Sequence, residues 1–196
     1  MTARHEITMS DIMPIADYAK IRMEKRKELS ARKKNRRVDV GPHVTFYFEN
    51  YATMWSQVHE MLYIEKGGAE QAKDELAAYN PLIPKGRELV ATFMVEIDDP
   101  LRRKRVLGQL GGIEEKAFLM IGGERIDAKP EQDQERTTDD GKASSVQFVH
   151  FMLNDAQAAA FKTAGTQVIV GLGHENYNHM SVVSEAVRAE LAGDLD

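Results

Sequence analysis

The sequence contains no cysteine among its 196 residues. This absence excludes disulfide bonds, thiolate metal sites, cysteine-ligated iron–sulfur clusters and cysteine nucleophiles. Long hydrophobic runs are missing as well: no stretch approaches the roughly 20 apolar residues that cross a bilayer. The first residues also lack the apolar stretch of a signal peptide. We therefore expect a cytoplasmic protein without a membrane span.

Loops that bind phosphate groups are also lacking. Glycine pairs occur at 67–68, 111–112 and 122–123, but none belongs to a GxGxxG or Walker pattern between a strand and a helix. No G-x-S-x-G nucleophile elbow is present. The sequence therefore contains no nucleotide motif, the cofactor is unknown, and a divalent metal stays an open alternative.

The charged residues are unevenly distributed. Between residues 22 and 37 there are nine Lys or Arg and two Glu, a local charge of +7 in a chain of net charge −5. Such a stretch is either a solvated helix face or a surface that docks an acidic partner. Nucleic acid is not expected, because no aromatic residues interleave the basic ones and the acidic remainder repels phosphates. The docking candidates are Lys25, Arg26, Lys33, Lys34, Arg36 and Arg37.

The periodicity of apolar residues predicts one α+β domain over residues 1–196. A long N-terminal helix is expected over 10–37, capped by Ser10 or Asp11, continuing through Pro14 and basic in its second half. The strands come as hairpins and neighbours, which favours a mostly antiparallel sheet of about seven strands with helices packed outside. The expected strands are 43–49, 89–97, 117–121, 124–128, 146–153, 166–172 and 180–183, and the further helices are 52–66, 69–79, 99–110, 154–164 and 184–192.

Residues 129–145 carry no apolar periodicity. They are rich in charged residues, Thr, Gln, Ser and Gly. This composition predicts a mobile surface loop.

The first candidate site is a polar cluster around the strand at 43–49. Alternation places His43, Tyr47 and Glu49 on one strand face, opposite the apolar residues. Gln57 and Glu60 lie three apart on one side of the next helix, and Glu96 comes close if the two strands pair. Carboxylates with a histidine could hold a hard metal ion or poise a general base. The alternative is a solvated sheet face.

The second candidate site contains the weaker metal ligands. His174 and His179 are five residues apart in a loop, and His150 lies on a nearby strand. This spacing matches no named metal motif. A lone His150 is more often a hydrogen-bonded core residue than a ligand.

Several short strings carry a resemblance that covers nearly the whole chain. In order they are Ser10-Asp11-Ile12-Met13-Pro14, Arg37-Val38 before Gly41-Pro42, Phe48-Glu49-Asn50, Gln57-x-x-Glu60-Met61, Tyr79-Asn80-Pro81-Leu82-Ile83-Pro84 and Thr92-x-x-x-Glu96-Ile97. This combination resembles the bacterial family known only as domain of unknown function 3501. The loop near 129–145 is the least characteristic part.

The resemblance implies a setting rather than a reaction. Similar proteins are encoded beside rubrerythrin-like proteins and iron–sulfur oxidoreductases of the heterodisulfide reductase type, which implies a non-catalytic accessory role in a redox or peroxide-response system. The expected partner is then such a redox protein. Two alternatives stay open: a metal-dependent enzyme or metal-binding protein that uses the polar cluster, and a small-molecule sensor with a pocket over the same face. Whether the chain is an enzyme is undecided, and a homo-oligomer is compatible with the sequence.

Overall fold

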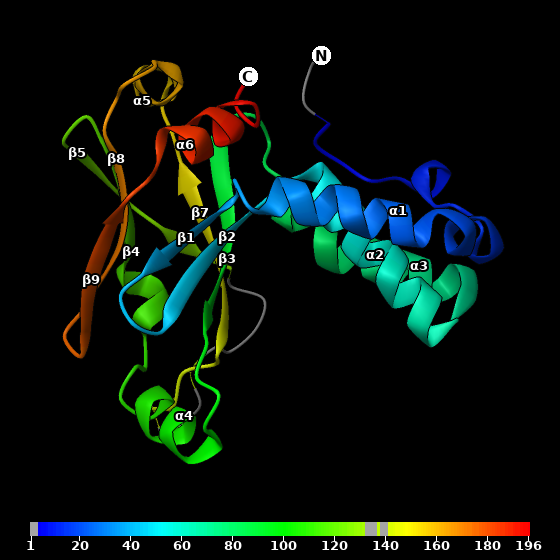
Figure 1. The fold of residues 1–196 in the computed structure, drawn as a ribbon, viewed down its shortest axis with the longest axis horizontal. Helices are drawn as coiled ribbons and strands as arrows, with labels where there is room; N and C mark the ends of the chain where they lie inside the picture. Colours follow the sequence, from blue (N-terminus) through cyan, green and yellow to red (C-terminus); the bar gives the residue numbers. More distant parts are fainter. Residues whose placement is uncertain (1–3, 132–136, 138–140) are drawn as a thin grey trace.

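The computed structural model describes residues 4–131, 137 and 141–196. It shows two sheets side by side and a lobe of three helices that projects from one of them (Figure 1). The helices are α1 (Ile15–Lys33), α2 (Tyr51–Glu65), α3 (Gly68–Tyr79), α4 (Pro100–Leu107), α5 (Asp155–Lys162) and α6 (Glu185–Ala192). The strands are β1 (Arg37–Val40), β2 (Val44–Glu49), β3 (Glu88–Val95), β4 (Ala117–Ile121), β5 (Glu124–Asp127), β6 (Lys129–Pro130), β7 (Val146–Met152), β8 (Val168–His174) and β9 (Tyr177–Val182).

The α+β class is confirmed, but the single sheet of about seven strands is wrong. The described residues form a five-stranded sheet of order β1-β2-β3-β7-β6 and a four-stranded sheet of order β5-β4-β8-β9, both antiparallel. The division arises because the β4–β5 hairpin pairs with β8 instead of β3 or β7. Two short strands, β1 and β6, were not predicted.

The inner faces of the two sheets share one hydrophobic core. Phe46 and Phe48 of β2 lie near Phe151 of β7, and Phe46 also lies 5.0 Å from Phe93 between ring centroids. The alternation predicted for 43–49 is confirmed, since Val44, Phe46 and Phe48 enter this core. The opposite face of β2 therefore looks toward the helices, which is the side of interest for function.

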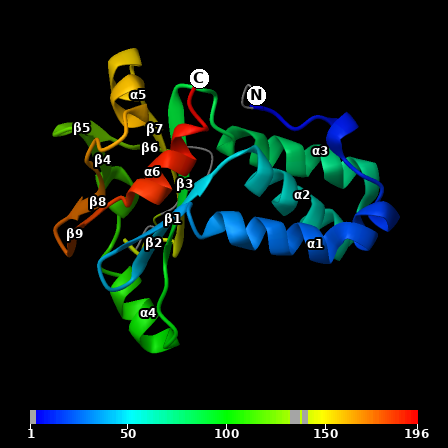
Figure 2. The ribbon, with the colours of Figure 1, turned by 45° about the horizontal axis from the view of Figure 1, so that its top comes forward.

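The lobe of α1, α2 and α3 covers part of that opposite face (Figures 1 and 2). A second hydrophobic core forms there between α2, α3 and the sheet, and Val90 of β3 belongs to it. Helix α2 begins cleanly because the Asn50 side chain accepts from the Thr53 backbone N–H at 3.1 Å. Helix α1 buries only Tyr18 fully, so most of its surface stays accessible.

The predicted N-terminal helix over 10–37 is longer than the observed one. Residues Met9–Asp11 form a separate 3-10 turn, and Pro14 has an extended ψ of 138°, so α1 starts at Ile15. At the other end α1 stops at Lys33, and Arg37 already belongs to β1. The alternating burial of β1, in which Val38 and Val40 face the core, accounts for the strand.

The predicted loop at 129–145 is only partly open to comparison. Lys129–Pro130 pairs with β7 as a strand, and Thr137 forms an isolated bridge with Ala143. The remaining residues of that prediction at 132–136 and 138–140 lie outside the described residues. Among the helices that the structure describes, none is both long enough and apolar enough to cross a membrane.

Candidate functional site

A groove runs between α1, α2 and the edge of the five-stranded sheet. It encloses about 820 Å³. Three of the residues predicted for the polar cluster, Tyr47, Gln57 and Glu60, line it. Four of the predicted docking residues line it as well: Arg26, Lys33, Lys34 and Arg37. The two predictions, made from separate patterns, therefore meet in one place, and we call it the basic groove.

One carboxylate, that of Glu60, lines the basic groove, and an ion pair with Arg22 neutralises it. Glu60 accepts hydrogen bonds from the Arg22 guanidinium at 2.9 and 2.7 Å and from the Tyr18 hydroxyl at 2.8 Å. The hydrogen bonds from Arg22 hold the pKa of Glu60 below its ordinary value. Burial, helped by the neighbouring carboxylate, raises the pKa of Tyr18 to about 12. Glu60 is therefore a fixed anion that positions α1 on α2.

The other two carboxylates of the predicted cluster have different partners. Glu49 is buried and accepts a hydrogen bond from the Thr92 hydroxyl at 2.8 Å. Glu96 is exposed and accepts from the Tyr47 hydroxyl at 3.0 Å. Burial and this carboxylate raise the pKa of Tyr47. The strand alternation is correct, but Glu49, Glu60 and Glu96 do not converge on a common point.

The candidate histidines occupy four separate environments. His43 Nε2 lies 3.3 Å from the Arg102 guanidinium. His174 is buried, with Nε2 3.2 Å from a backbone carbonyl that follows α4, and His179 is exposed on β9. His150 contacts two carboxylates on β3 and beside β6. In the part of the chain that the structure describes, no three His, Asp or Glu side chains are arranged to hold a metal ion.

His150 lies between two carboxylates. Its Nδ1 lies 2.9 Å from Glu88 Oε2, and its Nε2 lies 2.9 Å from Glu131 Oε2. Burial alone lowers the pKa of an imidazole, but the two carboxylates outweigh burial here and raise the pKa of His150 above 6.5. Both ring nitrogens are occupied, so His150 acts as a link between β7, β3 and the segment after β6.

Replacing His150 with glutamine is expected to flatten the dependence of stability on pH. Because the pKa is raised in the folded state, the stabilisation is fully present below about pH 6.5 and is lost as the pH rises through the folded-state value. Urea unfolding of the natural chain from about pH 6 to about pH 9 should show a falling free energy of unfolding. His179→Gln, at an exposed position, should keep that slope; an unchanged slope in His150→Gln would contradict the assignment.

The six basic docking candidates differ in their location and in their exposure to solvent. Arg26, Lys33, Lys34 and Arg37 are exposed in the basic groove. Lys25 faces a second hollow between α1 and α2, where it pairs with Glu28 at 2.9 Å. Arg36, in contrast, is only 2% exposed and is not available to a partner.

Arg36 instead connects the segment between α1 and β1 to the C-terminal residues. Its guanidinium forms an ion pair with Asp194 and donates to the backbone carbonyls of Phe48 at 3.0 Å and Glu49 at 3.1 Å. The Asn50 side chain donates to the same Asp194 carboxylate at 3.2 Å. Burial raises the pKa of Asp194 although Arg36 opposes that shift. Sequence patterns gave no signal for this network, because its two charges are 158 residues apart.

Comparisons with known proteins place the chain in a family. A solved structure from Burkholderia pseudomallei, described as a novel protein of unknown function, has a sequence 37% identical to this one. The match covers 97% of this chain and 99% of that chain, with a TM-score of 0.90. No match was found among curated proteins. The family model described as "Protein of unknown function (DUF3501)" matches residues 6–195. The chain therefore belongs to this family.

Proposed function

We propose that the chain is a non-catalytic accessory protein whose basic groove docks an acidic surface of a redox protein. One observation carries the proposal: four cations, Arg26, Lys33, Lys34 and Arg37, line the groove. Among the described residues none of these four forms an ion pair. The redox identity of the partner comes from the family setting that the sequence implies.

The physical chemistry of such a surface favours association with an acidic protein. Cations gathered on one side of an otherwise acidic chain create a local positive potential, which raises the rate of encounter with a negative surface. The groove also offers Gln57 for hydrogen bonding, and Met61 and Ile64 for apolar contact. Ile64 is 64% exposed, so its side chain is accessible to a partner in the groove.

The metal-dependent alternative has less support. Each of Glu49, Glu60 and Glu96 accepts hydrogen bonds from a different group, so a metal ion would have to break three separate arrangements. The small-molecule sensor, with a pocket over the same polar face, stays an alternative use of the basic groove, which Tyr47, Gln57 and Glu60 line.

Charge reversal in the groove should weaken partner binding by about tenfold or more. The test measures binding of two purified probes from the same genome, a rubrerythrin-like protein and an iron–sulfur oxidoreductase of the heterodisulfide reductase type. The groove variant is Lys33→Glu/Lys34→Glu. Its matched control is Lys104→Glu/Arg105→Glu, which makes the same change of charge in the last turn of α4.

Three outcomes of this binding experiment are informative. Binding that weakens as salt rises from about 50 to about 200 mM, and that only the groove variant loses, supports the proposal. Equal losses in both variants point to net charge instead of the groove. Absence of binding to either probe at low salt overturns the redox assignment.

A further inference from the structure

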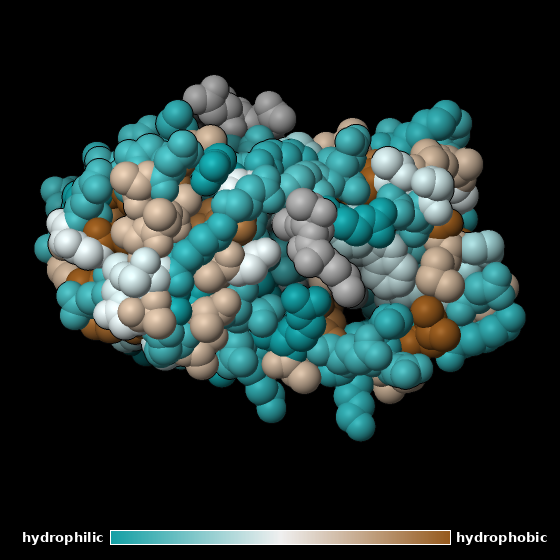
Figure 3. All heavy atoms as spheres, turned by 90° about the horizontal axis from the view of Figure 1, so that it is seen from above, coloured by the Kyte–Doolittle hydropathy of each residue, from teal (hydrophilic) through white to brown (hydrophobic). Residues whose placement is uncertain are grey.

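A second hollow lies beside the basic groove, also between α1 and α2. It encloses about 340 Å³ and meets the basic groove at Leu29 and Ser56, which line both. Figure 3 shows the face of the molecule hollowed where the helical lobe meets the sheets. We call this hollow the aromatic pocket; it is lined by Arg4, Lys25, Glu28, Leu29, Arg32, Tyr51, Ala52, Trp55 and Ser56.

The aromatic pocket exists because α1 and α2 are tightly packed at only one end. There, Tyr18 contacts Trp55 and His59, with centroid distances of 5.9 and 5.0 Å. Beyond that point the second half of α1 is polar apart from Leu29 and Ala31, and α2 presents the small side chain of Ala52. The space is therefore left unfilled by the chain's own side chains.

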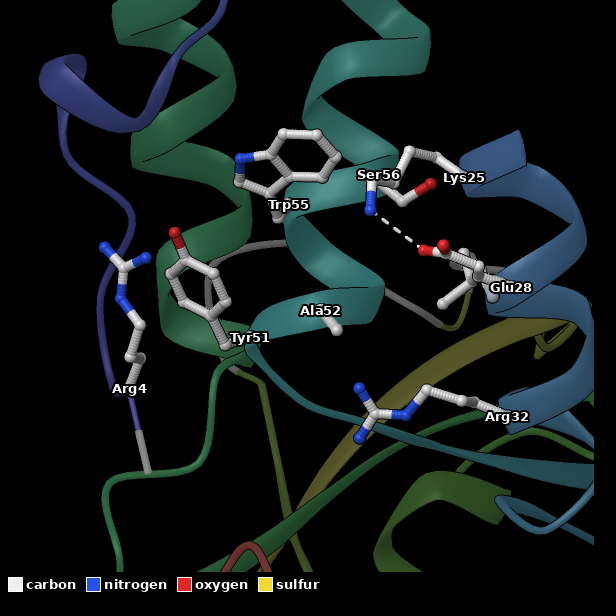
Figure 4. Close-up of a pocket in the computed structure, with 9 residues that line it drawn as sticks. Arg4, Lys25, Glu28, Arg32, Tyr51, Ala52, Trp55 and Ser56 are labelled. Atoms are coloured by element: carbon white, nitrogen blue, oxygen red, sulfur yellow. Dashed lines mark hydrogen bonds and ion pairs between the residues drawn. The ribbon is translucent and has the colours of Figure 1, made fainter. Parts of the chain in front are cut away.

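Two rigid aromatic side chains form one wall. The Trp55 ring lies 3.9 Å from the His59 ring and is tilted by 33° to it, and the indole N–H donates to the Asp11 carbonyl at 3.0 Å. The Tyr51 ring is covered by the Arg4 guanidinium at 4.2 Å. Since the indole N–H already has its acceptor, the wall offers ring surface to a ligand. Figure 4 shows Tyr51 and Trp55 on one wall, Glu28 and Arg32 on the other, and Ala52 between them.

The charged residues around the aromatic pocket favour an anion. The lining contains three cations, Arg4, Lys25 and Arg32. It contains one carboxylate, that of Glu28, which pairs with Lys25. Arg4 and Arg32 pair through one nitrogen each with Asp11 and Glu190, which lie outside the lining. A guanidinium has five N–H donors, so each arginine retains donors that can hold a carboxylate. The free donors of these arginines and the neighbouring aromatic rings suit a negative group beside a planar apolar body.

We propose that the aromatic pocket binds a small aromatic carboxylate of one or two rings, whose ring packs beside Trp55 and Tyr51 and whose carboxylate pairs with Arg4 or Arg32. The volume lies at the small end of ligand pockets, which sets the size of the ligand. This site is independent of the partner that the basic groove takes, so either proposal can fail without the other.

Trp55 gives a direct readout, because it is the only tryptophan in the chain. Benzoate and indole-3-acetate should shift the side-chain N–H resonance of Trp55 in NMR spectra in a saturable way. The neutral amides of both acids should bind about tenfold more weakly, since they lose the charged pairing. Hexanoate, an anion without a ring, should also bind about tenfold more weakly.

Three variants locate the binding. Ala52→Leu fills the pocket and should abolish the saturable shift, whereas Ala69→Leu, at the same second position of α3 and exposed, should leave it unchanged. Arg4→Gln and Arg32→Gln change accessible side chains, and at least one should weaken binding about tenfold. Shifts that are equal for acids and amides, that persist in Ala52→Leu, or that never saturate overturn the proposal.

Discussion

Replacing Arg36 with methionine is expected to lower the free energy of unfolding by about 3–5 kcal/mol, the cost of leaving a buried charge without its partner. The substitution strands the Asp194 carboxylate, which is 8% exposed, and removes the donor of two backbone carbonyls. For a domain of this size the midpoint of thermal unfolding should fall by about 6–20 °C. Urea unfolding followed by circular dichroism measures the loss.

Two further variants show whether the loss belongs to the buried pair. Arg32→Ala removes an exposed cation that pairs with Glu190 at 3.1 Å, and it should cost less than about 1 kcal/mol. The double variant Arg36→Met/Asp194→Leu removes both charges and should recover at least about half of the single-variant loss. A double variant that is as unstable as Arg36→Met would show that the carbonyl contacts, and not the charge pair, dominate.

Replacing Tyr177 with phenylalanine should cost about 2–4 kcal/mol, because one hydroxyl satisfies three backbone groups, of which two are buried and one is partly buried. The Tyr177 hydroxyl accepts from the His43 and Val44 N–H groups at 2.9 and 3.0 Å and donates to the Val40 carbonyl at 2.8 Å. These three groups belong to the β1–β2 turn, and Tyr177 begins β9. The hydroxyl thus fastens an edge of one sheet to an edge of the other.

Two measurements test Tyr177→Phe: the free energy of unfolding and the rate of hydrogen exchange in the β1–β2 turn. Hydrogen exchange at the His43 and Val44 amides should accelerate in Tyr177→Phe by more than global destabilisation explains. Tyr47→Phe is the matched control, since its hydroxyl bonds the exposed Glu96 and its loss should cost about 1 kcal/mol or less. Equal costs for the two variants would mean that the three backbone groups find other partners.

Local sequence patterns predicted the elements well where one face of an element is buried. The alternation at Val44, Phe46 and Phe48 and the glycine turn at 122–123 correspond to β2 and the β4–β5 hairpin. Period and turn chemistry act over a few residues, so a single sequence suffices for them. The same patterns do not say which strands pair, because pairing of β4 with β8 depends on residues far apart in the chain. The division into two sheets was therefore missed.

The candidate site was only half predictable for the same reason. Helical spacing correctly placed Gln57 and Glu60 on one side of α2, beside Tyr47. It could not show that Arg22 and Tyr18 would reach Glu60 from α1, which made the glutamate a structural anion. Likewise Arg36 belonged to a basic run by composition, yet tertiary packing buried it. A run of basic residues in a sequence predicts the sign of the local charge, but it does not predict which of the side chains are exposed.

The pairing of Arg36 with Asp194 has a consequence for the order of events during synthesis. The arginine leaves the ribosome 158 residues ahead of its carboxylate, and at typical elongation rates that delay lasts about 8–30 s. During this interval the guanidinium lacks its buried carboxylate, so this ion pair cannot yet stabilise the junction of α1 and β1. The first helix and hairpin of this chain are thus made well before their ion pair with the C-terminal segment can form.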